Sequence, residues 1–242
     1  MAPNAHRPRP GLFHALLVAF LVVGAAMLWL VKTQPARSLR HREAAWHVRI
    51  EPGDIVFQDL DCGLRCDLIR DLTRSPYTHV GIVLADAKGR RMVWEAYNAV
   101  GPVPLADWVE RGCGRRVAVY RLEPALLAKL PAIAAQVRAL RGKPYDADYQ
   151  WDDDRIYCSE LVEKAVERGA GVALFAPHPM GPGSFGRHAA IIARMTQDKL
   201  TEQTPLTSPA DLTRSPHLRR MVDELAGTGD RARNHSVSKE NG

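Results

Sequence analysis

The chain has 242 residues, of which 46% are hydrophobic and 25% charged; this is the composition of an ordinary globular protein, and the length allows one sizeable domain with appendages. The net charge is +6, but residues 1–45 hold six basic residues against one acidic residue, so the rest of the chain is close to neutral. Nucleic-acid-binding proteins carry their positive charge on a folded surface, so this distribution excludes nucleic acid as a partner.

The first predicted element is an apolar segment over residues 11–31, which follows a basic segment over residues 1–10. The 21 residues of this segment include no Asp, Glu, Lys or Arg, and as a helix they would span about 30 Å, the thickness of one hydrocarbon core. We predict an uncleaved transmembrane anchor, with a cleaved signal peptide as the alternative. Basic residues flank the segment on both sides, and their count slightly favours a cytoplasmic body.

A linker and a folded domain follow the apolar segment. Residues 32–50 are polar and basic and predict a linker, residues 51–226 predict the domain, and the polar residues 227–242 predict a disordered tail. Within the domain, hydrophobic periodicity and turn residues indicate a series of short elements. The predicted strands cover residues 55–57, 78–85, 116–122 and 173–175, and the predicted helices cover residues 62–73, 105–111, 131–140 and 158–169.

The turn over residues 86–89 fixes the register of a predicted hairpin. Its sequence suits a type I turn with Gly89 in the left-handed conformation. That register places Gly81 opposite Glu95, and it makes His79 the diagonal neighbour of Glu95 on one face, with about 7–8 Å between their backbones. A glutamate can reach an imidazole across this gap, whereas a slip of one residue would put the two side chains on opposite faces.

Cys158 begins the predicted helix over residues 158–169. A thiol in the first turn lies at the positive end of the helix dipole, which favours the nucleophilic thiolate. A lone cysteine is more often an inert core residue, but the polar stretch before Cys158 and the polar pair after it favour a nucleophile. With His79 as base and Glu95 as the group that orients the imidazole, the chain holds the three groups that a cysteine hydrolase needs.

The other three cysteines leave several interpretations open. Cys62 and Cys66 are four residues apart, which fits one helix face. In an oxidising compartment, two of Cys62, Cys66 and Cys113 could form a disulfide. The spacing lacks the form of a zinc knuckle and no second Cys/His pair accompanies it, so no metal site is predicted.

Several sequence blocks resemble a known family. Residues 142–145 (GKPY) and 158–162 (CSELV) resemble the Gly-x-Pro-Tyr and Cys-Ser block of NlpC-type cell-wall cysteine peptidases. In those peptidases the histidine follows the cysteine, whereas here His79 precedes it. This order, together with residues 53–58 and 75–82, resembles the circularly permuted papain-like group named YaeF/YiiX over about residues 51–226. The chain is more distantly similar to the lecithin:retinol acyltransferase superfamily.

The resemblance implies an α+β fold in which an antiparallel sheet packs on helices, preceded here by the single transmembrane helix. It implies Cys158 as nucleophile, His79 as general base and Glu95 as the orienting group. It also implies Tyr145 as an oxyanion or substrate contact, with an ordinary aromatic core residue as the alternative. The chemistry of such enzymes needs neither a metal ion nor an organic cofactor.

We therefore expect the chain to hydrolyse an amide through a thioester intermediate, and the resemblance places cell-wall peptides among the substrates. Two alternatives stay open. One is a thiol-dependent lipid acyl hydrolase or acyltransferase, which a membrane anchor would suit, and the other is a non-catalytic cell-envelope binding protein. The resemblance also implies a periplasmic domain anchored in a bacterial inner membrane, although the flanking charges lean the other way.

Overall fold

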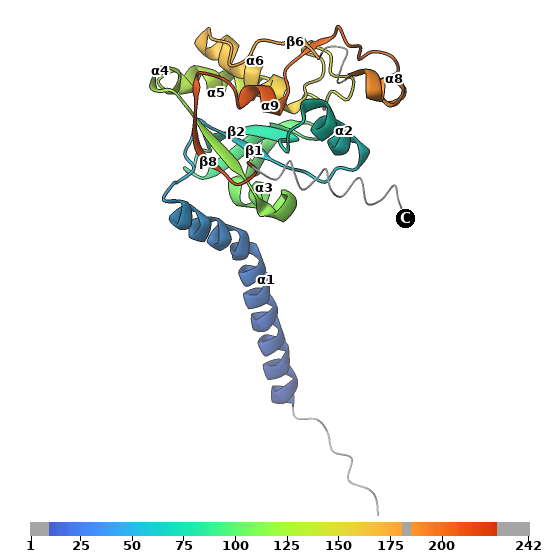
Figure 1. The fold of residues 1–242 in the computed structure, drawn as a ribbon. Helices are drawn as coiled ribbons and strands as arrows, with labels where there is room; N and C mark the ends of the chain where they lie inside the picture. Colours follow the sequence, from blue (N-terminus) through green and yellow to red (C-terminus); the bar gives the residue numbers. More distant parts are fainter. Residues whose placement is uncertain (1–9, 181–184, 227–242) are drawn as a thin grey trace, which may run out of the picture.

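A six-stranded antiparallel sheet forms the centre of the domain (Figure 1). Its strand order is β4-β3-β2-β1-β5-β8. The structure is a computed structural model that describes residues 10–180 and 185–226. The predicted disordered tail over residues 227–242 and all but the last residue of the predicted basic segment lie outside the described residues. The strands of the central sheet are β1 (Asp54–Gln58), β2 (His79–Ala85), β3 (Arg91–Ala96), β4 (Val100–Pro104), β5 (Ala118–Leu122) and β8 (Leu218–Asp223).

Helices cover both faces of this sheet, and a short second sheet joins β6 (His178–Pro179) to β7 (Pro205–Leu206). The helices are α1 (Pro10–Trp46), α2 (Leu64–Thr73), α3 (Leu105–Arg111), α4 (Pro124–Leu127), α5 (Leu130–Ala139), α6 (Cys158–Ala170), α8 (Ala189–Thr196) and α9 (Pro209–Leu212), with 3-10 turns at η1 (Cys113–Arg115) and η2 (Gly186–His188). The helices predicted within the domain are present, and their ends differ by at most two residues. The strand predicted over residues 173–175 is not formed.

The alternation of side chains along the strands gives the sheet two apolar faces. Phe57 and Ile82 belong to the face that packs against α5 and α6. Val56, Val83 and Val93 belong to the opposite face, which packs against α3 and the last part of α1. Because both faces are covered, every residue of β1 is buried, and so is every residue of β2 except the last.

Helices α5 and α6 touch backbone to backbone at Gly169. A Cβ atom added at Gly169 would lie 2.6 Å from the Ile133 backbone, so only glycine fits this crossing. The prediction that α6 ends at Gly169 is wrong by one residue: the helix continues to Ala170, and Gly171 ends it in the left-handed conformation with φ 73°. Gly169 therefore serves helix packing, and Gly171 serves the cap.

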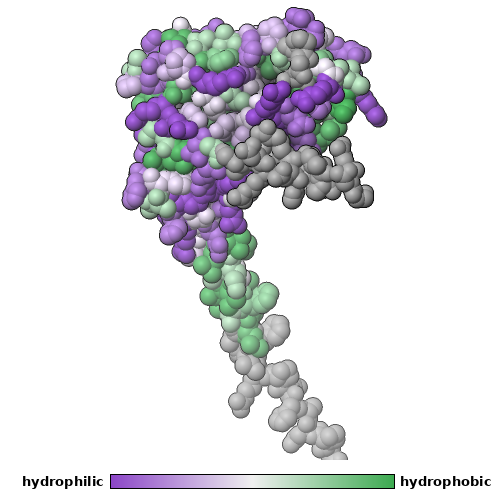
Figure 2. Space-filling model, in the orientation of Figure 1, coloured by the Kyte–Doolittle hydropathy of each residue, from purple (hydrophilic) through white to green (hydrophobic). Residues whose placement is uncertain are grey.

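Helix α1 has an exposed apolar shaft and a docked end. The described part of the shaft carries exposed hydrophobic side chains, green in Figure 2, and α1 is long and apolar enough to cross a membrane, as judged by length and composition. The helix continues through most of the predicted linker. There Leu39 is buried, and Trp46 Nε1 donates a hydrogen bond of 3.1 Å to Glu224.

Candidate active site

The β2–β3 hairpin has the predicted register. Gly89 adopts φ 73°, its N–H donates to the Asp86 carbonyl, and Ile82 pairs with Trp94, which places Gly81 opposite Glu95. A Cβ atom at Gly81 would lie only 2.9 Å from the Trp94 carbonyl oxygen. This register brings the His79 and Glu95 side chains together on one face.

Glu95 is a buried carboxylate with three donors. Its Oε2 lies 2.5 Å from His79 Nε2 and 3.0 Å from Trp108 Nε1, and the Arg111 guanidinium donates to the same oxygen. Burial alone would raise the pKa of Glu95, but the hydrogen bonds and charges of His79 and Arg111 outweigh it and lower the pKa to about 2. Because an ionised carboxylate only accepts hydrogen bonds, His79 Nε2 carries the proton and donates a hydrogen bond to Glu95.

Two of these donors are residues that sequence reasoning did not assign to the site. Trp108 and Arg111 both come from α3, where a spacing of three residues puts them on one helical face. The sequence predicted α3 with its observed bounds but gave no sign that it contacts Glu95. The nearest available signal was the buried glutamate itself, which needs more than one partner to balance its charge.

Cys158 meets His79 where two elements begin. It is the first residue of α6 and is a free, buried thiol, and His79 is the first residue of β2. Burial alone would lower the pKa of His79, but hydrogen bonds and charge interactions with Cys158 and Glu95 outweigh it and raise the pKa to about 9. Since Nε2 is engaged by Glu95, Nδ1 is the ring nitrogen left to exchange a proton with the thiol.

Side chains of α6 hold the loop that precedes this helix. The Tyr157 N–H donates to Glu160 Oε2 over 3.0 Å, and Lys164 pairs with Glu160 Oε1 over 2.6 Å although only 2% of the Lys164 side chain is exposed. The ammonium of Lys164 also lies 2.9 Å from Asp153 and 5.0 Å from the Trp151 ring centroid. These contacts hold the polar loop against the first turns of α6 and so fix the position of the thiol.

Tyr145 lies beside the thiol at the wall of a cleft. Burial, with contributions from Tyr149 and Cys158, raises the pKa of Tyr145 well above its usual value, so the phenol stays protonated and can donate. The guanidinium of Arg65 lies 5.3 Å from the centroid of its ring. The structure thus places all four predicted site residues in one region.

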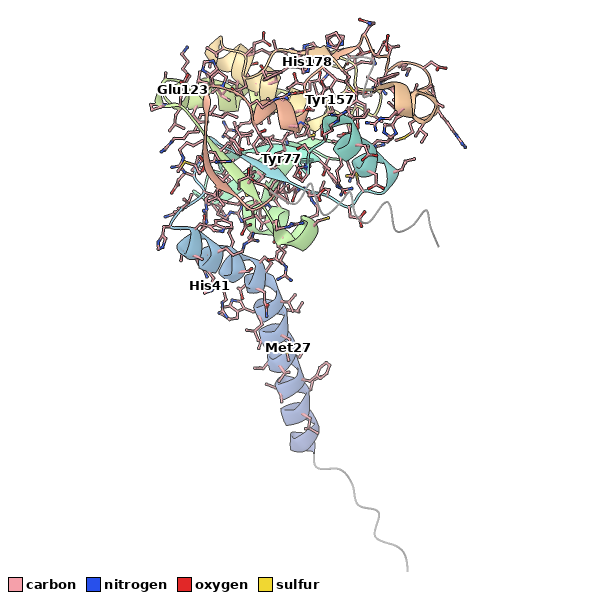
Figure 3. The ribbon with its side chains drawn as sticks, viewed as in Figure 1. Met27, His41, Tyr77, Glu123, Tyr157 and His178 are labelled. Carbon is pink, nitrogen blue, oxygen red and sulfur yellow. A yellow bond between two sulfur atoms is a disulfide. The ribbon has the colours of Figure 1, made fainter. Side chains whose placement is uncertain are left out.

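The cleft extends from Cys158 between α2 and α8. It encloses about 700 Å³ of empty space, including the part open to solvent. Tyr157 lines it where α6 begins, and Figure 3 shows this residue on the far side of the sheet from Met27 of α1.

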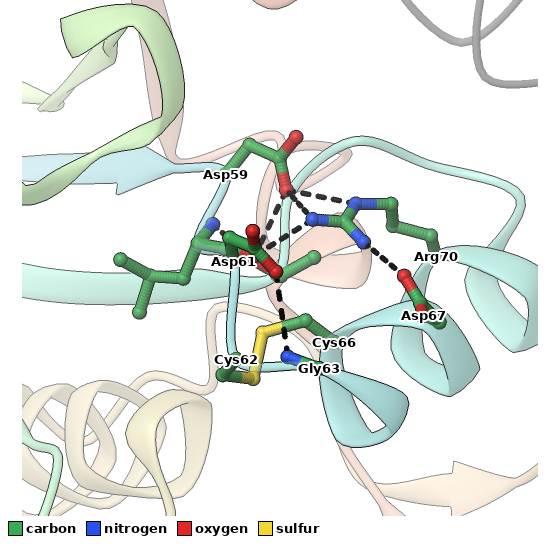
Figure 4. Close-up of a disulfide and its surroundings, with 9 residues drawn as sticks. Asp59, Asp61, Cys62, Gly63, Cys66, Asp67 and Arg70 are labelled. Carbon is green, nitrogen blue, oxygen red and sulfur yellow. Dashed lines mark hydrogen bonds and ion pairs between the residues drawn. A yellow bond between two sulfur atoms is a disulfide. The ribbon is translucent and has the colours of Figure 1, made fainter.

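A disulfide joins Cys62 to Cys66 at the start of α2 (Figure 4). Cys62 precedes the helix, so the two sulfurs do not share one helix face, and among the described residues Cys113 and Cys158 remain free. Arg70 also fixes α2, because it pairs with Asp59 over 2.8 Å. Helix α2, which forms one wall of the cleft, is therefore held by the disulfide at its start and by the Arg70–Asp59 ion pair nearer its end.

Comparison with known proteins bears on this arrangement. The family described as "permuted papain-like amidase enzyme, YaeF/YiiX, C92 family" matches residues 49–222. The chain belongs to this family. The resemblance read from the sequence is confirmed, and the YaeF/YiiX family accounts for the order in which His79 precedes Cys158.

Two relatives within the family come from Escherichia coli. The uncharacterized protein YiiX of strain K12 is 32% identical over 123 residues, which make up 50% of this chain and 60% of that protein. A crystal structure of YiiX from strain O157:H7 has 26% sequence identity and a TM-score of 0.65, and the match covers 73% of this chain and 98% of that one. The structural match supports the predicted α+β, permuted papain-like fold.

The O157:H7 protein is described as a metalloprotein. In the described part of the present chain, no group of three or more His, Cys, Asp or Glu side chains is placed to hold a metal ion. The Glu95 carboxylate instead accepts hydrogen bonds from Trp108 and Arg111. The described residues therefore do not fit a metal centre.

Proposed function

We propose that the chain is a cysteine amidase in which Cys158 attacks the carbonyl carbon of an amide. The observation that carries the proposal is the buried contact between His79 and an ionised Glu95, which leaves His79 Nδ1 to the only thiol among the described residues that lines the cleft. A raised pKa keeps His79 in its charged form at neutral pH, which favours the thiolate beside it. The family description as an amidase supports the same class of reaction.

The reaction proceeds in two steps. The sulfur of Cys158 bonds to the carbonyl carbon, the C–N bond breaks, and His79 gives its proton to the leaving amine. Water then attacks the thioester carbon and passes a proton to His79, the C–S bond breaks, and the carboxylic acid leaves. Glu95 stays ionised throughout and holds the imidazole in the orientation that both transfers require.

Two groups could stabilise the oxyanion that forms on the carbonyl oxygen when the sulfur attacks the carbonyl carbon. The protonated phenol of Tyr145 is one donor, and the Cys158 N–H at the start of α6 is the other. Donors fixed in place before the reaction stabilise the transition state more than the substrate. This role for Tyr145 goes beyond that of an aromatic core residue.

We also propose that α1 anchors the domain in a membrane and that the domain lies on the periplasmic side. The exposed apolar shaft of α1 supports the anchor, with a cleaved signal peptide as the alternative. The Cys62–Cys66 disulfide supports the periplasm, because disulfides persist in oxidising compartments. A reporter fused after residue 242 tests the orientation: an alkaline phosphatase fusion should be active, and an active cytoplasmic reporter at the same position would contradict the proposal.

The amidase proposal is tested on the full chain in detergent micelles. A thiol-reactive acyl probe should label Cys158, and Cys158→Ser and His79→Ala should each lower the hydrolysis of a model amide by at least about 10³-fold. Cys113→Ser is the matched control, because Cys113 is the other free cysteine in the described part of the chain and should keep wild-type turnover. Wild-type turnover in Cys158→Ser would refute the proposal, and absence of any Cys158 adduct would favour a binding protein.

A further inference from the structure

The basic residues that follow the apolar segment have no part in the proposed reaction. Between residues 32 and 45 the chain has four Lys or Arg residues and one Glu. Two of these charges, on Arg42 and Glu43, form ion pairs with side chains of the domain. Arg37 and Arg40 of α1 are exposed instead, so they can meet a partner outside the domain.

The end of the apolar segment sets the depth of these arginines. The proposed anchor leaves the hydrocarbon core at Val31, and the head-group layer beyond it is about 5–7 Å thick, or about four residues of helix. Side chains on a helix tilt toward its N-terminus, which for α1 is the direction of the bilayer. The guanidinium of Arg37 lies 5.2 Å from the centroid of the Trp29 ring, so its charge lies at the level of the head groups.

The domain reaches the same depth beside α1. A pocket between the two encloses about 580 Å³ of empty space, including the part open to solvent. It is lined by Val31, Gln34, Pro35 and Ser38 of α1, by Glu110 of α3 and by Arg115 of η1. Because Val31 ends the apolar segment, the pocket and Arg115 lie at the head-group layer. Figure 2 shows hydrophilic side chains, in purple, at the base of the domain where the apolar shaft begins.

The groups in this pocket suit the head group of a phospholipid. The Arg115 side chain is 62% exposed, and its Nε lies 2.8 Å from Glu110; a guanidinium has five N–H donors, so one ion pair leaves others for a phosphate. Arg42 donates a hydrogen bond to the Arg115 carbonyl and so holds η1 against α1. Pro35 has no N–H, so the helix supplies no donor to the Val31 carbonyl, which can accept from a head-group hydroxyl.

We propose that this junction of α1 with η1 binds an anionic phospholipid of the bilayer that holds the helix. Its head group would occupy the pocket beside Arg115, and Arg37 and Arg40 would attract further anionic head groups around α1. The inference rests on the membrane anchor proposed above, and it does not depend on the amidase chemistry. Helix α6, with Cys158, covers the opposite face of the sheet (Figure 1), so a domain held in this way has its thiol on the side away from the bilayer.

The test measures lipid binding by the full chain in neutral detergent micelles, with native mass spectrometry as the readout. Phosphatidylglycerol should bind about 100-fold more tightly than phosphatidylcholine with the same acyl chains, because each of the three arginines contributes about fivefold near an anionic surface. Arg115→Gln should lower the affinity for phosphatidylglycerol about fivefold, and the triple variant with Arg37→Gln and Arg40→Gln should lose the preference. Glu110→Gln should instead strengthen the binding of phosphatidylglycerol, because it removes the negative charge from the pocket.

Arg138→Gln is the matched control, because Arg138 is exposed on α5, on the other face of the sheet, and should keep the wild-type preference. Equal binding of the two lipids by the wild type, an unchanged preference in the triple variant, or weaker binding by Glu110→Gln would overturn the proposal. Extraction of membranes with alkaline carbonate tests the anchor separately. Release of the chain would refute the anchor and the lipid site together, whereas a chain that stays in the membrane without a lipid preference would refute the lipid site alone.

Discussion

The two faces of the central sheet divide the work of the site between them. The face toward α5 and α6 carries the larger apolar core, and α6 brings the thiol to the end of β2. The face toward α3 is smaller and also receives the end of α1, yet it holds both His79 and Glu95 together with the donors that keep Glu95 ionised. A face that looks purely structural therefore sets the charge of the proposed catalytic pair.

This comparison teaches that the proposed nucleophile, Cys158, and the proposed base, His79, depend on different packing. The position of Cys158 depends on the crossing of α5 with α6 and on the loop before α6. The protonation of His79 depends on Glu95 and, through Glu95, on α3. Changes on the two faces should therefore have different signatures, one on stability and the other on the pH dependence of turnover.

The largest effect is expected from Glu95→Gln. A neutral amide removes the charge that favours the His79 imidazolium and no longer fixes the Nε2 proton, so kcat/KM should fall by about 10²- to 10⁴-fold. The remaining activity should decline at a lower pH than in the wild type, because the pKa of His79 loses one of the causes that raise it. Steady-state kinetics between pH 5 and pH 10 measure both effects, and an unchanged alkaline limb would show that Glu95 does not act on His79.

The wild-type pH profile is the next test. The pKa of His79 is raised to about 9, so kcat/KM should hold through neutral pH and fall as the imidazolium loses its proton above pH 9. The same linkage affects stability: the contribution of the charged His79 is complete below its usual pKa of 6.5 and is lost as pH rises through about 9. A profile that instead rises through pH 9 would contradict an imidazolium–thiolate pair.

The sequence predicted the hairpin and the contact between His79 and Glu95 because short-range rules determine them. The turn at Gly89 fixes the register, and the register alone places Glu95 beside His79. The first turn of α6 was equally readable, since the change from a polar stretch to helical periodicity begins at Cys158. In each case the decisive information lies within about ten residues of the chain.

The sequence did not predict features that depend on distant partners. Strand β8 reads as polar because much of it is exposed at the sheet edge, and β4 has two prolines and a glycine, which occur in strands mainly at edges. The roles of Trp108 and Arg111 depend on how α3 packs against β3. The apolar character of the cleft depends on α2 and α8, which are more than 100 residues apart in the sequence.

A smaller effect of opposite sign is expected from Arg111→Gln. Removing this cation leaves the Glu95 carboxylate to act on His79 alone, so the pKa of His79 should rise and the alkaline limb should move upward, where Glu95→Gln moves it downward. Turnover at neutral pH should change by less than about tenfold, because Trp108 still donates to Glu95. Lys at the same position should restore most of the wild-type profile. A downward shift in Arg111→Gln would mean that α3 merely positions Glu95.

The smallest effect on turnover is expected from Gly169→Ala on the other face. The added methyl group meets the Ile133 backbone at 2.6 Å, so α5 and α6 must separate slightly, and the free energy of unfolding should fall by about 1–3 kcal/mol. Gly186→Ala is the matched control, because a Cβ atom there meets open space. Thermal unfolding and the pH profile are measured on the same samples. Since this face positions the sulfur but does not set the charge of His79, the melting temperature should drop while the alkaline limb stays in place. A shifted limb would show that packing on the α6 side also sets the pKa of His79, and the division between the two faces would then fail.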